Sequence, residues 1–131
     1  RAVSAIANGG TVYNPIIIKG AEPQIAQKVE GIKPEVWNIV REGMRQGVLI
    51  GTAKGLNAEY VHIAAKTGTA ELGVTKDNVN SWTTGFFPYE NPRYAFVVVM
   101  EKGNSHNVIG GVAVSRKLFD WMSIYTPEYF E

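Results

Sequence analysis

The strongest constraint on how this chain folds is a row of three extended segments joined by short polar loops. They read YVHIAAKTGTAEL over residues 60–72, SWTTGFFP over 81–88 and RYAFVVVMEKG over 93–103. Each is rich in β-branched and aromatic residues, which favour strands. Because loops this short join antiparallel neighbours, the pattern predicts a three-stranded antiparallel meander. We expect the first segment to be a central strand, and the apolar run from Ala95 to Met100 predicts a third strand buried on both faces.

Helical patterns flank these strands. Pro34 suits the first turn of a helix that ends before Gly51, and its apolar residues recur every three or four positions, at Val36, Trp37, Val40, Met44 and Val48. The last helix groups its apolar residues on one side, at Val114, Leu118, Trp121, Met122 and Tyr125. We expect that side to cover a face of the sheet.

The N-terminal part of the chain predicts smaller elements. A short helix ends at Asn8, where Gly9 and Gly10 can take the left-handed conformation that closes a helix. Residues 11–18 and 23–29 then form a strand or hairpin with Asn14-Pro15 as a bend. The predicted fold class is therefore α+β: an antiparallel sheet of three main strands plus a small hairpin, covered by helices, in one domain over residues 1–131.

Composition narrows the partners and cofactors. Thirteen basic and twelve acidic side chains nearly cancel, and no run of Lys or Arg could follow a phosphate backbone, so we expect no nucleic acid partner. Cysteine is absent, which excludes disulfides and thiolate metal sites. His62 and His106 lie too far apart for a metal-ligand spacing, and we expect no metal and no cofactor. No apolar run approaches the roughly 18 residues that span a bilayer.

The stretch HIAAKTGTAEL ends in residues that suit a binding edge. In a regular strand, Lys66 and Gly68 share one face and Thr67 and Thr69 share the other. An ammonium attracts a carboxylate, a hydroxyl can hydrogen-bond it, and a glycine lets a ligand lie against the strand. The N–H after Gly68 could point at a developing oxyanion if the strand lies at an edge. Taken alone, Lys-Thr-Gly is a weak signal and favours a solvated strand end with Gly68 in a bulge.

Four stretches in order give the chain a resemblance to a known family. They are AIANGGTVYNP, VREGMRQGV with the GTA that follows it, AAKTGTAEL, and SWTTGFFPYENPRYAFVVVMEKG. With them, nearly the whole chain resembles the C-terminal part of the transpeptidase domain of class B penicillin-binding proteins, which are serine enzymes that carry SxxK, SxN and KTG motifs. The resemblance implies a partial β-lactamase-like or transpeptidase-like fold. It also implies a parent enzyme that cross-links peptidoglycan stem peptides through a serine acyl-enzyme, the same serine that β-lactams acylate.

The resemblance also implies roles for individual residues. Lys66, Thr67 and Gly68 would be the catalytic residues of this chain and line one wall of the active-site groove. Thr69 would bind the carboxylate of the substrate or the β-lactam, and its N–H would be one of two oxyanion-hole donors. Trp82 would pack beside this strand as a second candidate for the groove. Because simple alternation separates the side chains of Lys66 and Thr69, we expect a twist or bulge near Gly68.

The other two motifs of the family are missing from this sequence. None of its serines is followed by lysine three places later, so there is no SxxK. Ser105-His106-Asn107 imitates SxN but follows KTG instead of preceding it, and we interpret it as a turn and N-cap. Tyr89-Glu90-Asn91 is interpreted as a turn between strands. We expect the nucleophile, its lysine, the SxN motif, the helical subdomain and the first sheet strands to lie upstream, so that residues 1–131 are a C-terminal fragment, inactive alone.

The partners follow from the same resemblance. They are the peptidoglycan stem peptide, β-lactam antibiotics, the missing N-terminal part of the domain and other cell-wall synthesis proteins. The resemblance also implies a cellular location for the parent protein: the extracytoplasmic face of the bacterial cytoplasmic membrane, where an N-terminal transmembrane helix would anchor it. An unpaired sheet edge and an uncovered apolar face predict that the isolated fragment self-associates. Two alternatives stay open: a serine β-lactamase or β-lactam sensor domain, and a non-catalytic interaction module, which the absence of SxxK favours.

The remaining polar and aromatic candidates have simpler interpretations. His62 is a lone imidazole, which we expect to be packed or hydrogen-bonded. Nothing in the sequence brings Glu71 and Glu101 together, so we interpret both as surface charges. The tryptophans Trp37, Trp82 and Trp121 lie in apolar patterns and are predicted to be core or groove-lining residues.

Overall fold

The structure, a computed structural model, describes residues 1–107 and 109–130. The elements in chain order are helix α1 (Ala2–Ala7), strands β1 (Thr11–Tyr13) and β2 (Ile25–Lys28), helix α2 (Pro34–Leu49), the 3-10 turn η1 (Lys54–Leu56), strands β3 (Ala64–Leu72), β4 (Asn78–Phe87) and β5 (Tyr94–Asn104), helix α3 (Gly111–Tyr125) and the 3-10 turn η2 (Pro127–Tyr129). The predicted order of helix, hairpin, helix, three strands and helix is confirmed. The α+β class is confirmed with it.

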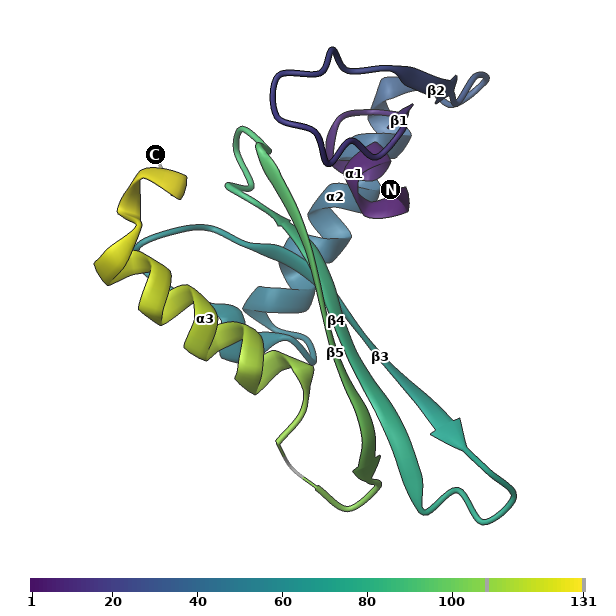
Figure 1. Cartoon of the computed structure of the whole chain (residues 1–131), viewed down its shortest axis with the longest axis vertical. Helices are drawn as coiled ribbons and strands as arrows, with labels where there is room; N and C mark the ends of the chain where they lie inside the picture. The colour runs from purple at the N-terminus through teal and green to yellow at the C-terminus, as the bar shows by residue number, and fades with distance from the viewer. Residues whose placement is uncertain (108, 131) are drawn as a thin grey trace.

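The three main strands form the predicted antiparallel meander, in the spatial order β3-β4-β5. β4 is therefore the middle strand, and the expectation that the first strand is central is wrong. The pairing of β3 with β4 runs without a shift from Ala64 opposite Phe86 to Leu72 opposite Asn78. Figure 1 shows the strands as a long twisted ribbon whose lower half extends past the helices. This arrangement leaves β3 with one unpaired edge in the described part of the chain.

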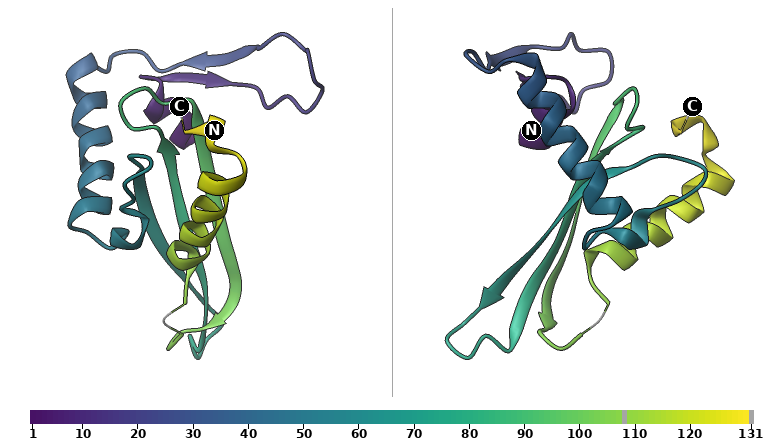
Figure 2. Two further views of the ribbon diagram at one scale, coloured as in Figure 1. Left: turned by 90° about the vertical axis from the view of Figure 1, so that its left-hand side faces the viewer. Right: turned by 180° about the vertical axis from the view of Figure 1, so that it is seen from behind.

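Helices cover the two faces of the sheet at different places (Figure 2). On one face, Phe87 and Phe96 pack against Phe119 of α3, with ring centroids 5.1 and 5.0 Å from that of Phe119. The opposite face meets α1 and α2 only at one end of the sheet. At that end a second, smaller hydrophobic cluster forms, and its buried residues are Ala7, Met44, Ala64 and Phe86. Among the residues that the structure describes, no helix therefore lies over the other end of this second face.

Strand β5 is exposed on this second face. Its side chains alternate, and the exposed fraction is 62% for Val97 and 38% for Val99. The expectation that residues 95–100 are buried on both faces is wrong, because β5 is an outer strand and α1 reaches only its first residues. A β-bulge places Glu101 and Lys102 opposite Asn80, whose Oδ1 accepts the N–H of Lys102 at 3.0 Å.

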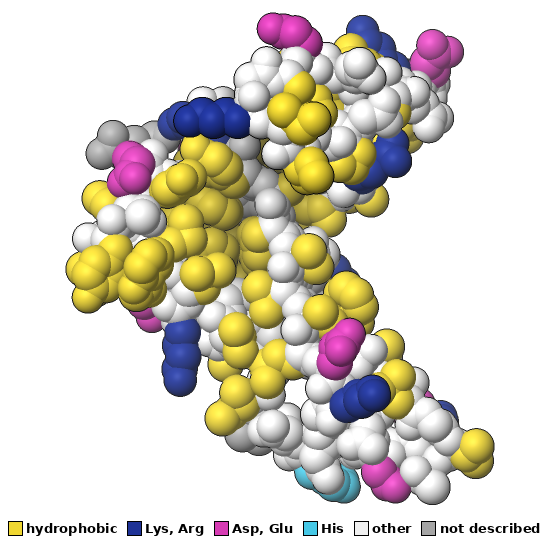
Figure 3. All heavy atoms as spheres, in the orientation of Figure 1, with side chains coloured by type: hydrophobic (Ala, Val, Ile, Leu, Met, Phe, Trp, Pro, Cys, Tyr) yellow, Lys and Arg dark blue, Asp and Glu magenta, His cyan; other side chains and the backbone are white. Residues whose placement is uncertain are grey.

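Helix α3 presents to the sheet a different face from the predicted one. Its buried residues are Gly111, Ser115 and Phe119, and of the predicted apolar face only Met122 packs against the core. The others stay exposed: Val114, Leu118, Trp121 and Tyr125. Apolar residues occupy more than one side of the helix, so spacing alone does not choose the buried side, and small residues let it approach β4 closely. Figure 3 shows hydrophobic side chains gathered over α3 as an outward-facing apolar surface.

The N-terminal hairpin and α2 follow the predictions more closely. β1 and β2 pair antiparallel, which confirms the hairpin. α1 ends at Ala7, and Gly10 follows with φ +111°; a Cβ there would lie 2.9 Å from Cζ2 of Trp37. The hairpin thus sits against α2 through a glycine. Of the predicted apolar stripe of α2, Met44 and Val48 are buried, whereas the N-terminal half of the helix extends past the sheet.

Candidate functional site

The Lys-Thr-Gly segment lies on the free edge of β3, where odd-numbered residues turn their backbone polar groups outward. A Cβ on Gly47 of α2 would lie 2.8 Å from the carbonyl oxygen of Ala65, so that carbonyl points away from β4. Backbone groups alternate along an antiparallel strand. The N–H and C=O of Thr67 and Thr69 therefore also point to the free edge. Consistently, the Thr67 carbonyl accepts a hydrogen bond from Nζ of Lys66.

The side chains of the segment divide between the two faces, as alternation predicts. Thr67 and Thr69 lie on the face that α3 covers, opposite Thr83 and Ser81 of β4. Gly68 pairs with Trp82 on the other face, where a Cβ on Gly68 would lie 3.5 Å from Cβ of Trp82. The bulge expected near Gly68 is absent, because the β3–β4 register is unbroken there.

A cavity of about 590 Å³ opens beside Thr67 and Thr69. Its walls come from β3, β4, the turn after α2 and the first turns of α3. Four hydroxyl side chains line it: Thr52, Thr67, Thr69 and Ser81. Arg116 and Lys117 of α3 line the opposite side. Hydroxyl donors facing basic side chains suit a ligand that carries a carboxylate.

The two basic residues of α3 differ in what their charges do. Arg116 donates to Oδ1 of Asp120 at 2.7 Å and to the carbonyl of Asn57 at 2.9 Å, so it ties α3 to the η1 turn. Its hydrogen bond, followed by that of Tyr60, holds the pKa of Asp120 below the usual value. Burial and the Asp120 hydrogen bond raise the pKa of Tyr60 to about 12. In the described part of the chain Lys117 has no ion-pair partner, and its charge is available to the cavity.

The beginning of α3 is held against β4 by a contact that the sequence pattern did not predict. Oγ of Ser81 accepts the N–H of Gly111 at 3.0 Å. The N-cap residue is Gly110, which makes no side-chain cap. The interpretation of Ser105-His106-Asn107 as a turn holds, but its second part, an N-cap for the helix, is wrong. A β4 side chain instead satisfies a free N–H of the first turn.

The lesser candidates behave as interpreted, with one exception. Nδ1 of His62 hydrogen-bonds Oε1 of Glu90 and lowers the pKa of that carboxyl. Glu71 forms a surface ion pair with Lys76. Tyr89-Glu90-Asn91 occupies the turn between β4 and β5. Trp121 is the exception, because its exposed fraction is 51% on the outer side of α3, away from core and cavity. Among residues 1–107 and 109–130, no three His, Asp or Glu side chains gather as metal ligands would.

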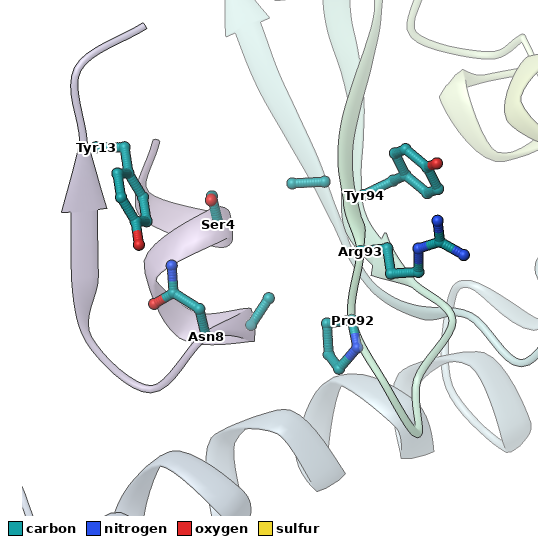
Figure 4. A pocket seen from close by; sticks show the side chains of 8 residues that line it. Ser4, Asn8, Tyr13, Pro92, Arg93 and Tyr94 are labelled. Atoms are coloured by element: carbon teal, nitrogen blue, oxygen red, sulfur yellow. The ribbon is translucent and has the colours of Figure 1, made fainter. Parts of the chain in front are cut away.

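A second hollow, of about 210 Å³, lies at the other end of the sheet between α1 and the start of β5 (Figure 4). Ser4, Asn8 and Tyr13 lie on one side of it, while Arg93 and Tyr94 direct their side chains away. No set of reactive groups converges there. The geometry therefore favours the Lys-Thr-Gly edge as the candidate site.

Comparison with known families shows where this edge belongs. Residues 1–120 match the family described as "Penicillin binding protein transpeptidase domain". The chain belongs to this family. The predicted resemblance is therefore confirmed, and the solved structure reported below confirms the partial transpeptidase-like fold.

Several members of the family cover most of the chain. Penicillin-binding protein H of Bacillus subtilis is 30% identical over 139 residues, which include 88% of this chain and 20% of that protein. The peptidoglycan D,D-transpeptidase PbpA of Mycolicibacterium smegmatis is 28% identical over 126 residues, with 88% and 26% covered. Penicillin-binding protein 2B of Streptococcus pneumoniae has a TM-score of 0.74 at 26% identity, over 95% of this chain and 24% of its own. This chain thus spans 20% to 26% of the length of these relatives.

Proposed function

We propose that this chain supplies one wall of the active site of a peptidoglycan D,D-transpeptidase. The observation that carries the proposal is the position of Lys66–Thr69: in a penicillin-binding transpeptidase domain, the segment lies on a free strand edge beside a hydroxyl-lined cavity. The relative from M. smegmatis is named a peptidoglycan D,D-transpeptidase. The relatives from B. subtilis and S. pneumoniae are named penicillin-binding proteins, and we therefore extend the proposal to β-lactam binding.

Lys66, Gly68 and Thr69 each have a role in the proposed acyl transfer. The ammonium of Lys66 supplies positive charge at the edge, and Gly68 leaves room for a substrate backbone beside the strand. The Thr69 hydroxyl donates to the ligand's terminal carboxylate, a charge-assisted hydrogen bond. The Thr69 N–H, which points to the free edge, donates to the carbonyl oxygen as it becomes an oxyanion. Trp82 borders the wall beside Gly68.

The nucleophile is not among these 131 residues. In the proposed reaction a serine outside this sequence attacks the carbonyl of the penultimate D-Ala and expels the terminal D-Ala. An amine of a second stem peptide then takes the acyl group and frees the serine. Nucleophile, base and oxyanion hole must act together, so residues 1–131 alone are inactive in this proposal.

The proposal places the parent protein at the extracytoplasmic face of the bacterial cytoplasmic membrane, where it meets peptidoglycan and other cell-wall synthesis proteins. A membrane anchor would lie outside this sequence. In the part of the chain that the structure describes, no helix is both long enough and apolar enough to cross a membrane.

The test uses the full-length protein and a fluorescent penicillin, with the covalent adduct confirmed by mass. We expect one penicillin per protein, and about 100-fold slower acylation for Lys66→Ala or for Thr69→Pro, which removes the N–H donor. Lys76→Ala, a surface lysine in the β3–β4 turn, is the matched control and should react normally. A full-length protein that forms no adduct would overturn the proposal in favour of a non-catalytic module. Rapid release of hydrolysed penicillin would instead indicate a β-lactamase.

A further inference from the structure

The turn after α2 is held rigidly against the free edge of β3. Gly47 meets the Ala65 carbonyl without room for a side chain, and a Cβ on Gly51 would lie 2.9 Å from the carbonyl oxygen of Gly47. The N–H of Ala53 donates to that same Gly47 carbonyl at 3.0 Å, and Ala53 is buried in the larger core cluster. Two glycines and a buried alanine thus fix the backbone on both sides of Thr52.

The fixed turn brings Thr52 onto the middle residue of the Lys-Thr-Gly segment. Oγ1 of Thr52 lies 2.7 Å from Oγ1 of Thr67, and the two hydroxyls line the cavity together with that of Thr69. Thr67 and Thr69 project from the same face of β3. Three hydroxyls therefore share one wall, and one of them touches β3 from outside the strand.

The direction of the Thr52–Thr67 hydrogen bond decides what the wall offers a ligand. A hydroxyl has one proton to donate and two lone pairs that accept. When Thr52 donates to Thr67, the Thr67 proton is free to point into the cavity beside that of Thr69. A carboxylate in the cavity favours this direction, since an anion accepts and cannot donate.

We propose that Thr52 is a positioning residue, which makes the wall selective for a carboxylate by turning the Thr67 hydroxyl toward the ligand. Thr52 acts through Thr67, and its contribution depends on the anionic group of the ligand. This inference rests on the proposed function, because the carboxylate in question is that of the stem peptide or the β-lactam.

The experiment compares benzylpenicillin with its methyl ester, which lacks the carboxylate charge, on the full-length protein. Thr52→Val removes the donor and keeps the shape. We expect it to slow acylation by benzylpenicillin about fivefold, the effect of one hydrogen bond, and to change the ester's rate by less than about twofold. Thr52→Ser keeps the hydroxyl and should restore the benzylpenicillin rate. Thr75→Val, at an exposed position in the β3–β4 turn, is the control and should leave both rates unchanged.

A double-variant comparison separates positioning from a general loss of structure. In a Thr67→Val background, Thr52→Val should have no further effect on benzylpenicillin, because its only target is gone. If Thr52→Val slowed acylation by benzylpenicillin and by its ester equally, or slowed neither, the inference would be overturned. Acylation of the wild-type protein would still support the proposed function in that case. Thr52→Ala serves the same comparison if Thr52→Val does not fold. A wild-type protein that neither ligand acylates would overturn both proposals.

Discussion

Replacing Gly47 with alanine tests how α2 and β3 are joined, because this one glycine sets the distance between them. Alanine in the middle of a helix is worth about 0.5–1 kcal/mol over glycine. At Gly47 the new Cβ would lie 2.8 Å from the carbonyl oxygen of Ala65, a backbone atom that no side-chain rotation can move. Overpacking of this kind costs about 1–3 kcal/mol. We therefore expect Gly47→Ala to lower the free energy of unfolding by about 1 kcal/mol.

Gly43 provides the matched control on the same helix. A Cβ at Gly43 would have no heavy atom within 4 Å, so Gly43→Ala should raise the free energy of unfolding by about 0.5–1 kcal/mol. The two variants should thus differ by about 2 kcal/mol in urea unfolding of the full-length protein. Gly47→Ala should also slow penicillin acylation, because the shift of α2 carries Thr52 away from Thr67. Equal stability of the two variants would show that the helix is not in tight contact with the strand edge.

Three further predictions concern other parts of the molecule. Ser81→Ala should lower the free energy of unfolding by about 1 kcal/mol, measured by urea unfolding, because the Gly111 N–H loses its acceptor. Tyr60 should titrate near pH 12 when tyrosinate absorbance is followed, and Asp120→Asn should lower this pKa. Because the pKa is raised in the folded protein, the stability that Tyr60 contributes is present below pH 10.0 and is lost as the pH rises through about 12. The isolated 131-residue chain should self-associate, as measured by light scattering, and Trp121→Lys should weaken this association because Trp121 is an exposed apolar side chain. A monomer at all concentrations would contradict this prediction.

The fold was predictable from sequence where local pattern and local structure agree. Pro34 begins α2 and the turn residues separate the three strands, so element order and meander followed from spacing. The buried side of α3 did not follow, because apolar residues occupy more than one side of the helix. The choice depends on Gly111 and Ser115, which are small enough to let α3 lie against β4. How closely a helix approaches a strand depends on the side chains of both elements, whereas a hydrophobic pattern describes only the helix.

The candidate site divides in the same way. Lys66 to Thr69 were selected by the resemblance of their motif and its neighbouring stretches to the family, and alternation assigned their faces correctly. The contact between Thr52 and Thr67 could not be predicted, because the two residues are fifteen positions apart and meet only through the packing of a glycine-containing turn. Its signal in the sequence was the GTA that follows α2, for which the residues alone offered no chemical reason. The Ser81 contact with α3 likewise joins residues thirty positions apart.

The place of β3 in the sheet removes the main difficulty that the sequence raised. With β3 central, Lys66 and Thr69 would face opposite sides of a covered sheet, and only a bulge at Gly68 could bring them to one ligand. With β3 at the edge, the pairing stays regular and a ligand can lie along the edge itself. There it meets the Thr69 N–H directly and can reach side chains from either face. An edge strand thus lets one ligand contact both sets of alternating residues, and the cost is an unpaired edge that something must cover.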